Sequence, residues 1–229
     1  MATTLVTNGK IAGALNGTTS SAIDTTGASL IVLSIGQYDV GSDVTLSDSK
    51  GNTWVKLTVQ SNFDTRSWIA YCINPTVGTG HTFTIAGSNS YSFATISAWV
   101  GTAAATTFRS QNSANSAIAN SIQPGSVTPD ANGQLVWTGF CGFVNASSTI
   151  NSSFTITDQN AGASGTCYGG AGAYLIQGTA AAVNPTWSTN DAANDSTANI
   201  AVFEVGPYST PANASGADAT YYNSFARNF

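Results

Sequence analysis

The chain has 229 residues, of which 42% are hydrophobic and only 7% are charged, and its formal net charge is −5. Charged residues usually make up about a quarter of a soluble protein. Hydrophobic residues nevertheless recur in periodic blocks, so the composition predicts a folded domain and excludes a disordered chain. The six basic residues are scattered without forming a patch or an arm. This excludes nucleic-acid binding by phosphate neutralisation.

The N-terminal segment MATTLVTNGKIAG has neither a basic n-region nor an apolar h-region, and no run of the chain is long enough to span a membrane. If the chain is complete, we expect a protein that is made in a cytosol, does not use the standard secretory route and has no membrane partner. An extracellular location is the alternative.

Short strand-like runs bounded by Gly, Asn, Asp and Pro follow one another along the chain, and no run predicts a long helix. The expected strands are 30–38, 44–47, 53–60, 68–73, 81–86, 93–100, 133–143, 154–157, 171–176 and 199–205, with a polar stretch at 101–120. This density of short strands predicts an all-β fold, specifically one jelly-roll-like β sandwich over residues 1–206.

A weak internal echo relates residues 21–101 to residues 121–206. Each half opens with D-x-x-G before a long apolar strand, continues through a T-x-S/T-D turn and an aromatic strand, and ends on V-G. Two pseudo-repeats of this size predict either two small sandwiches or two halves of one. We expect one compact sandwich, because no Pro/Gly-rich linker separates the repeats.

The most regular stretch is VTLSDSKGNTWVKLTV, at residues 44–59. Two alternating runs flank a turn in which Asp48 favours the first position and Gly51 can adopt positive φ, so the stretch predicts a β-hairpin. A calcium loop would need further carboxylates at alternate positions, and Lys50 would repel the ion. Alternation places Trp54 on the outer face of the second run.

An outward-facing tryptophan needs a partner, which can be a neighbouring loop, another subunit or a sugar ring. Intrachain cover is the commonest of these. The candidates for stacking on a glycan or an interface are Trp54, Trp68 and Trp187.

Catalytic residue patterns are almost absent. His81 is the sole histidine, which excludes a two-histidine metal site within one chain, and the sequence has no G-x-S-x-G elbow. Glu204 is the sole glutamate, at the end of the last expected strand, and no aspartate is marked as its partner for glycoside hydrolysis. We therefore expect no catalytic residues, no metal ligands and no cofactor.

Three cysteines are present and form no C-x-x-C pair. Cys72 and Cys141 lie inside apolar strand-like runs, which predicts buried free thiols. A disulfide between Cys72 and Cys141 is the alternative, and Cys167 would then be left over.

The segments SDSKGNTW, WIAYCINPTVGTGHTFTIAG and FATISAWVG together resemble β-sandwich modules of bacteriophage virion proteins and of bacterial surface proteins. The resemblance covers residues 21–205, and its motifs specify a scaffold rather than a site. It implies a non-enzymatic virion protein, assembled in the host cytoplasm, on the outside of the particle. Capsid decoration or another head-associated role is expected first. A carbohydrate-binding or adhesin module, of a tail fibre or a bacterial surface, is the alternative.

The expected partners are further copies of the chain, with a trimer as the first expectation, and other virion proteins. Residues 207–229 are the candidate contact. After Gly206 the strand pattern stops, and a Pro/Ala/Ser/Gly linker leads to a cluster of aromatic residues and one arginine. We expect this cluster to dock onto a neighbouring subunit or the capsid shell, or alternatively to fold back on its own sandwich. Its members are Tyr221, Tyr222, Phe225, Arg227 and Phe229.

Overall fold

The computed structural model describes residues 2–38, 41–117, 120–142, 147–162, 169–189 and 195–209. In these ranges the protein is all-β, as predicted, and contains no helix; every paired strand is antiparallel. The same ranges consequently hold no helix that could cross a membrane. Cys167 and the C-terminal aromatic cluster lie outside the described residues.

The first sheet contains the N-terminal half of the chain. Its main path is β1 (Thr3–Thr19), β7 (Phe83–Gly101), β2 (Leu30–Tyr38), β6 (Thr65–Ile73) and β4 (Val55–Lys56). Two short strands lie off this path: β3 (Thr45–Asp48) pairs with β7, and β5 (Gln60–Asn62) pairs with β6. Both ends of β7 contribute to one hydrophobic cluster, so the sheet curls into a half-barrel.

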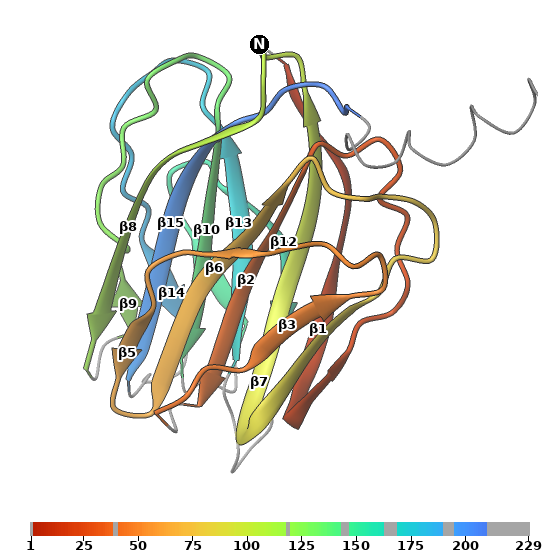
Figure 1. The fold of residues 1–229 in the computed structure, drawn as a ribbon. Coiled ribbons are helices and arrows are strands. Elements are labelled where there is room, and N and C mark those ends of the chain that lie inside the picture. The colour runs from red at the N-terminus through yellow and green to blue at the C-terminus, as the bar shows by residue number, and fades with distance from the viewer. Residues whose placement is uncertain are drawn as a thin grey trace, which may run out of the picture.

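The second and third sheets contain the C-terminal half. The second sheet has the order β12 (Thr155–Asn160), β13 (Gly169–Ile176), β10 (Leu135–Gly142), β15 (Ser196–Glu204) and β8 (Thr107–Ser116). The third has the order β11 (Ser148–Ile150), β14 (Trp187–Thr189) and β9 (Ser121–Ile122). Figure 1 shows the first sheet, coloured red to yellow, stacked against the green-to-blue second sheet.

Each main sheet is covered on both faces. Alternate residues of β2 point in opposite directions: Ile31 and Leu33 join the cluster inside the half-barrel, whereas Leu30 and Val32 meet Trp137 of the second sheet. The outer face of the second sheet forms a third cluster, which the third sheet covers. Double coverage explains why β2, β10 and β15 are buried along almost their whole length and are continuous apolar runs in the sequence.

Small residues let the two main sheets approach closely. A Cβ atom placed on Gly139 would lie 1.6 Å from Ser34 Oγ, and one on Gly172 would lie 2.2 Å from Thr95 Oγ1. Ser67 hydrogen-bonds Asn199 across the same interface (Oγ to Oδ1, 2.6 Å), with both residues buried. The interface between the two main sheets is therefore apolar around Trp137 and consists of small and hydroxyl-bearing residues around Gly139.

Side-chain amides close one side of the sandwich, between β5 and β8. Alternate residues of β8 reach across: Gln111 accepts from the Thr58 N–H (3.1 Å) and donates to its hydroxyl (3.0 Å). Gln60 donates to Ser113 (3.0 Å), and Asn115 donates to the Ser61 carbonyl (3.1 Å). These bonds occupy polar groups at sheet edges that could otherwise pair with another chain.

The opposite side is closed in the same manner, between β1 and β12. Asn8 donates to the Asp158 carboxylate (2.7 Å), and Lys10 donates to the Gln159 carbonyl (2.8 Å). The high Asn, Gln, Ser and Thr content of this chain thus has a structural use, because neutral hydrogen-bonding side chains join strands that share no backbone ladder.

Two expectations need correction. Strands β1 and β8 were not expected, since their exposed polar sequences lack a hydrophobic period. The predicted hairpin at residues 44–59 is also wrong: β3 pairs with β7 and β4 pairs with β6, so the flanking strands do not pair with each other. The strand orders do not confirm a jelly-roll connectivity.

Candidate functional site

The turn after β3 forms as its sequence predicts. Asp48 ends the strand, and its Oδ1 accepts hydrogen bonds from the backbone N–H groups of Lys50 (2.8 Å) and Asn52 (3.4 Å). The Gly51 N–H returns to the Asp48 carbonyl (3.3 Å), and Gly51 adopts a φ of 73°. An aspartate that binds its own downstream backbone is the usual chemistry of such turns.

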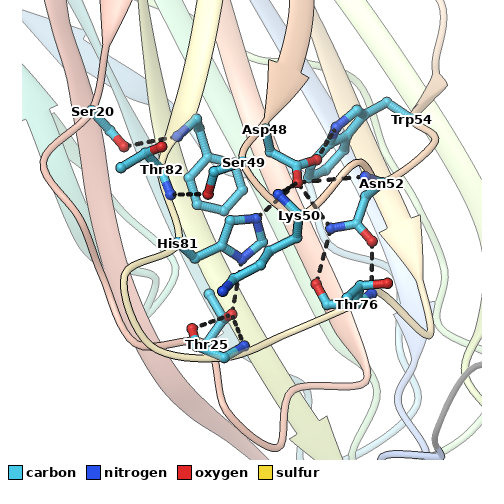
Figure 2. Close-up of polar contacts among 12 residues, drawn as sticks. Ser20, Thr25, Asp48, Ser49, Lys50, Asn52, Trp54, Thr76, His81 and Thr82 are labelled. Atoms are coloured by element: carbon cyan, nitrogen blue, oxygen red, sulfur yellow. Dashed lines mark hydrogen bonds and ion pairs between the residues drawn. The ribbon is translucent and has the colours of Figure 1, made fainter. Parts of the chain in front are cut away.

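Side chains from distant parts of the chain converge on the same carboxylate (Figure 2). His81 Nε2 lies 3.0 Å from Asp48 Oδ1, and the Trp54 indole N–H donates to Oδ2 at 2.9 Å. The side-chain amide of Asn52 adds a third contact, at 3.2 Å. We call Thr25, Asp48, Asn52, Trp54 and His81 the Asp48 cluster.

Thr25 completes the cluster on the far side of the imidazole. Its hydroxyl lies 2.9 Å from His81 Nδ1 and accepts a hydrogen bond from the Gly78 N–H (3.2 Å). The His81 ring stacks on Phe83, with centroids 4.3 Å apart. An aspartate, a histidine and a hydroxyl are therefore joined in the order found in nucleophilic active sites.

The pKa of the Asp48 carboxyl shows how strongly the cluster holds its charge. Burial by itself raises this pKa. Hydrogen bonds from His81, from the Lys50 and Asn52 backbone and from Trp54 outweigh burial, and the pKa lies below its usual value. The folded protein thus favours the ionised form of a carboxylate whose side chain is fully buried.

The reactive groups of this cluster are closed off from solvent. The side chains of Asp48 and His81 have 0% exposure, and Thr25 is 0% exposed as a residue. A substrate cannot reach the hydroxyl without opening the fold. Outward of the carboxylate, Asn52 exchanges two hydrogen bonds with the backbone of Thr76 (3.0 and 2.7 Å). The cluster therefore fastens the loop before β7 onto the turn after β3.

Two of the three candidate tryptophans are core residues, and the third, Trp54, is partly buried. Trp54 was expected to face outward and instead packs edge-on against Phe83, with centroids 6.0 Å apart. The alternation used to place it fails because β4 begins only at the next residue. Trp68 is 2% exposed and Trp187 is 0% exposed, so both belong to the core.

Glu204 is committed to an ion pair. Arg109 contacts its carboxylate and also lies 3.7 Å from Asp130. The single guanidinium between the two carboxylates offsets part of their negative charge, an arrangement that differs from the acid and base couple that glycoside hydrolysis needs. Elsewhere in the described ranges, no three His, Cys, Asp or Glu side chains gather as metal ligands would.

Cys72 and Cys141 are buried thiols, as predicted. Cys141 points between the two main sheets, where a Cβ on Gly36 would approach its sulfur to 2.8 Å. Burial raises its pKa to about 12. Burial, with the nearby Asp48 charge, raises the pKa of Cys72 to about 11.

A polar groove that the sequence patterns did not indicate lies where β8, β9 and the residue before β14 meet. Its volume is about 470 Å³, and its lining residues are Asn115, Ser116, Ser121, Ile122, Gln123 and Thr186. Phe63, in the turn between β5 and β6, is 80% exposed. In the sequence, the only signal for it is a phenylalanine between the expected strands 53–60 and 68–73.

Comparisons with known protein families, with curated proteins and with solved structures find no match to this chain.

Proposed function

We propose that this chain is a non-enzymatic structural protein on the outside of a bacteriophage particle, most simply a capsid-decoration or other head-associated protein. The main observation behind this proposal is that the Asp48 cluster has a structural role. Among the described residues, the one group with the chemistry of an active site is buried and fastens a loop to the sandwich.

The polar contacts at the sheet edges also support a structural role. The β5–β8 side of the sandwich is closed by amide and hydroxyl contacts without charged groups, and the β1–β12 side adds only Lys10 and Asp158. A surface of neutral hydrogen-bonding groups suits a protein that packs against neighbours at high local concentration, because it carries few repelling charges. Partners of this kind are further copies of the chain, with a trimer as the first proposal, and other virion proteins. The C-terminal aromatic cluster at residues 221–229 is the proposed contact.

We propose, in addition, that the sandwich is built from two equivalent halves, corresponding to the pseudo-repeats at 21–101 and 121–206. The two sheets support this through their strand order. Each half consists of one long strand that precedes the repeat, β1 or β8, and three long strands within it. Counting only these long strands, the first sheet has the order first, fourth, second and third: β1, β7, β2, β6. The second sheet has the same order: β8, β15, β10, β13. Each sheet takes its strands from one half, which favours the duplicated form of the jelly-roll-like sandwich expected from the sequence.

Immunogold electron microscopy of particles purified from the native source tests the proposed role. Antibodies against the folded chain should label the particle exterior at regular positions. Mass spectrometry of the same particles should detect the chain in stoichiometric amounts. Its absence from pure particles would contradict the proposal.

The proposed arm is tested separately by truncation after Ser209 rather than after Gly206. The Gly206 carbonyl accepts from Ser29 Oγ (2.6 Å) and from the Gly101 N–H (2.9 Å), so a chain end there would disturb the sandwich itself. The shortened chain should keep its melting temperature and lose assembly or particle binding. Loss of folding would assign the segment to the core instead.

A further inference from the structure

The groove beside β8 is lined mainly by neutral polar side chains. Ile122, which is 5% exposed and belongs to the core under the third sheet, is the one apolar residue in its described lining. Asn115 and Ser116 come from β8, Gln123 follows β9, and Thr186 precedes β14. Its volume of about 470 Å³ lies within the usual range of small-ligand sites, roughly 300–1,000 Å³.

Several of its polar groups have capacity for a ligand. Gln123 donates to Thr186 Oγ1 (3.1 Å), which leaves the Gln123 carbonyl oxygen as an acceptor. Asn115 uses its amide nitrogen on Gln60 and Ser61, which leaves its oxygen likewise. Within the described part of the chain, the side-chain hydroxyls of Ser116 and Ser121 make no hydrogen bond.

Phe63 follows, in the chain, a residue that contacts the groove lining, and its backbone conformation is unfavourable. Asn62 donates to the Ser116 carbonyl in the groove lining (2.8 Å), and Phe63 is the next residue in the chain. It is the first residue of a two-residue turn between β5 and β6, with a φ of 42°. Glycine is the residue favoured at such a position, and a bulky residue at positive φ is an outlier.

The fold gains little from this side chain, since the ring is 80% exposed. Figure 1 shows β5 beside the end of β8, so the turn and the groove lie at the same end of the sandwich. Strained residues gather at binding sites, where the geometry they impose is useful. An exposed ring held beside a groove of amides and hydroxyls matches the two-sided chemistry of a sugar, which has an apolar C–H face and polar hydroxyls.

We propose that this groove binds a neutral oligosaccharide, with Phe63 stacking on a sugar ring and Asn115, Gln123 and the serine hydroxyls binding its hydroxyl groups. Among the described lining residues none is charged, and Asp195 lies 3.3 Å from the Asn62 amide, whose nitrogen contacts the groove residue Ser116. The carboxylate would repel sialylated or sulfated glycans. This proposal concerns the isolated chain and does not depend on the proposed place on a particle.

The test is binding of the full chain to a printed array of neutral, sialylated and sulfated glycans, followed by calorimetric titration of the strongest neutral ligand. Neutral glycans should be retained in preference to anionic ones. Phe63→Gly and Gln123→Ala should each weaken binding about tenfold. Phe63→Gly relieves the backbone strain, so its melting temperature should equal or exceed that of the parent, which separates lost binding from lost folding.

Leu15→Ala is the matched control. Leu15 is also an exposed apolar residue, at 56%, but it lies on β1, at the other edge of the first sheet. Its removal should leave glycan binding unchanged. An array without a neutral ligand overturns the proposal, and so does a bound neutral glycan whose affinity survives both groove substitutions. Neither result bears on the immunogold test of particle location.

Discussion

Replacing Asp48 by alanine should be among the most destabilising substitutions in this protein. The change removes the acceptor of five donors, of which the closest three are His81 Nε2, the Trp54 indole N–H and the Lys50 N–H, at 3.0, 2.9 and 2.8 Å from the carboxylate. Each buried donor without a partner costs about 1–3 kcal/mol. The losses overlap because the donors share one group, so we expect a net loss of about 3–5 kcal/mol.

That loss is large against a total folding free energy of about 5–15 kcal/mol. It corresponds to a fall in melting temperature of roughly 6–20 °C for a domain of this size. Urea unfolding followed by tryptophan fluorescence measures it directly. Asp64→Ala is the matched control, because Asp64 is exposed in the turn after β5, and its loss should change the unfolding free energy by less than about 0.5 kcal/mol. If Asp48→Ala unfolds within about 1 kcal/mol of the parent, the cluster is not the fastening described here.

The same carboxylate makes stability depend on pH. Its pKa in the folded protein lies below the value of 3.8 expected in the unfolded chain, so folding favours the ionised form. The stabilisation is complete well above 3.8 and is lost as the pH falls through the folded-state pKa. Acid titration of the unfolding free energy should therefore show a steeper fall in the parent than in Asp48→Asn. Parallel curves would show that another group carries the acid sensitivity.

Further predictions concern the thiols, the sheet interface and the amide contacts. Cys72 and Cys141, with pKa values of about 11 and 12, should resist iodoacetamide at neutral pH until urea is added, as peptide mapping by mass spectrometry would show; rapid native alkylation would contradict their burial. Gly139→Ala should cost about 1–3 kcal/mol by overpacking against Ser34, and adding Ser34→Gly should recover part of that loss in urea unfolding. Gln111→Ala should cost only about 0.5–1.5 kcal/mol in the same assay, since it removes two exposed neutral hydrogen bonds; a larger loss would mean that the β5–β8 contact holds the sheets together.

The sequence by itself was sufficient for the fold class and for the central strands. β2 and β10 are continuous apolar runs between turn residues, and their observed limits differ little from the expected ones. The turn at Asp48 was also predictable, because an aspartate that binds its own backbone and a glycine at positive φ act over four residues. Hydrophobic periodicity and turn chemistry depend only on residues that are close together in the chain. They can therefore be recognised in a single sequence.

Only the tertiary structure decided which strands pair and which polar side chains meet. β3 and β4 follow one another in the chain but pair with different strands, and His81 reaches Asp48 from 33 residues away. Strand β8 pairs with β15 and makes side-chain amide contacts with the segment around β5, and its sequence has no hydrophobic period that would predict either contact. The reason is physical: Asn, Gln, Ser and Thr bond equally well with many partners, so their sequence leaves the choice open. The packing of the two sheets brings particular partners within reach and thereby selects them.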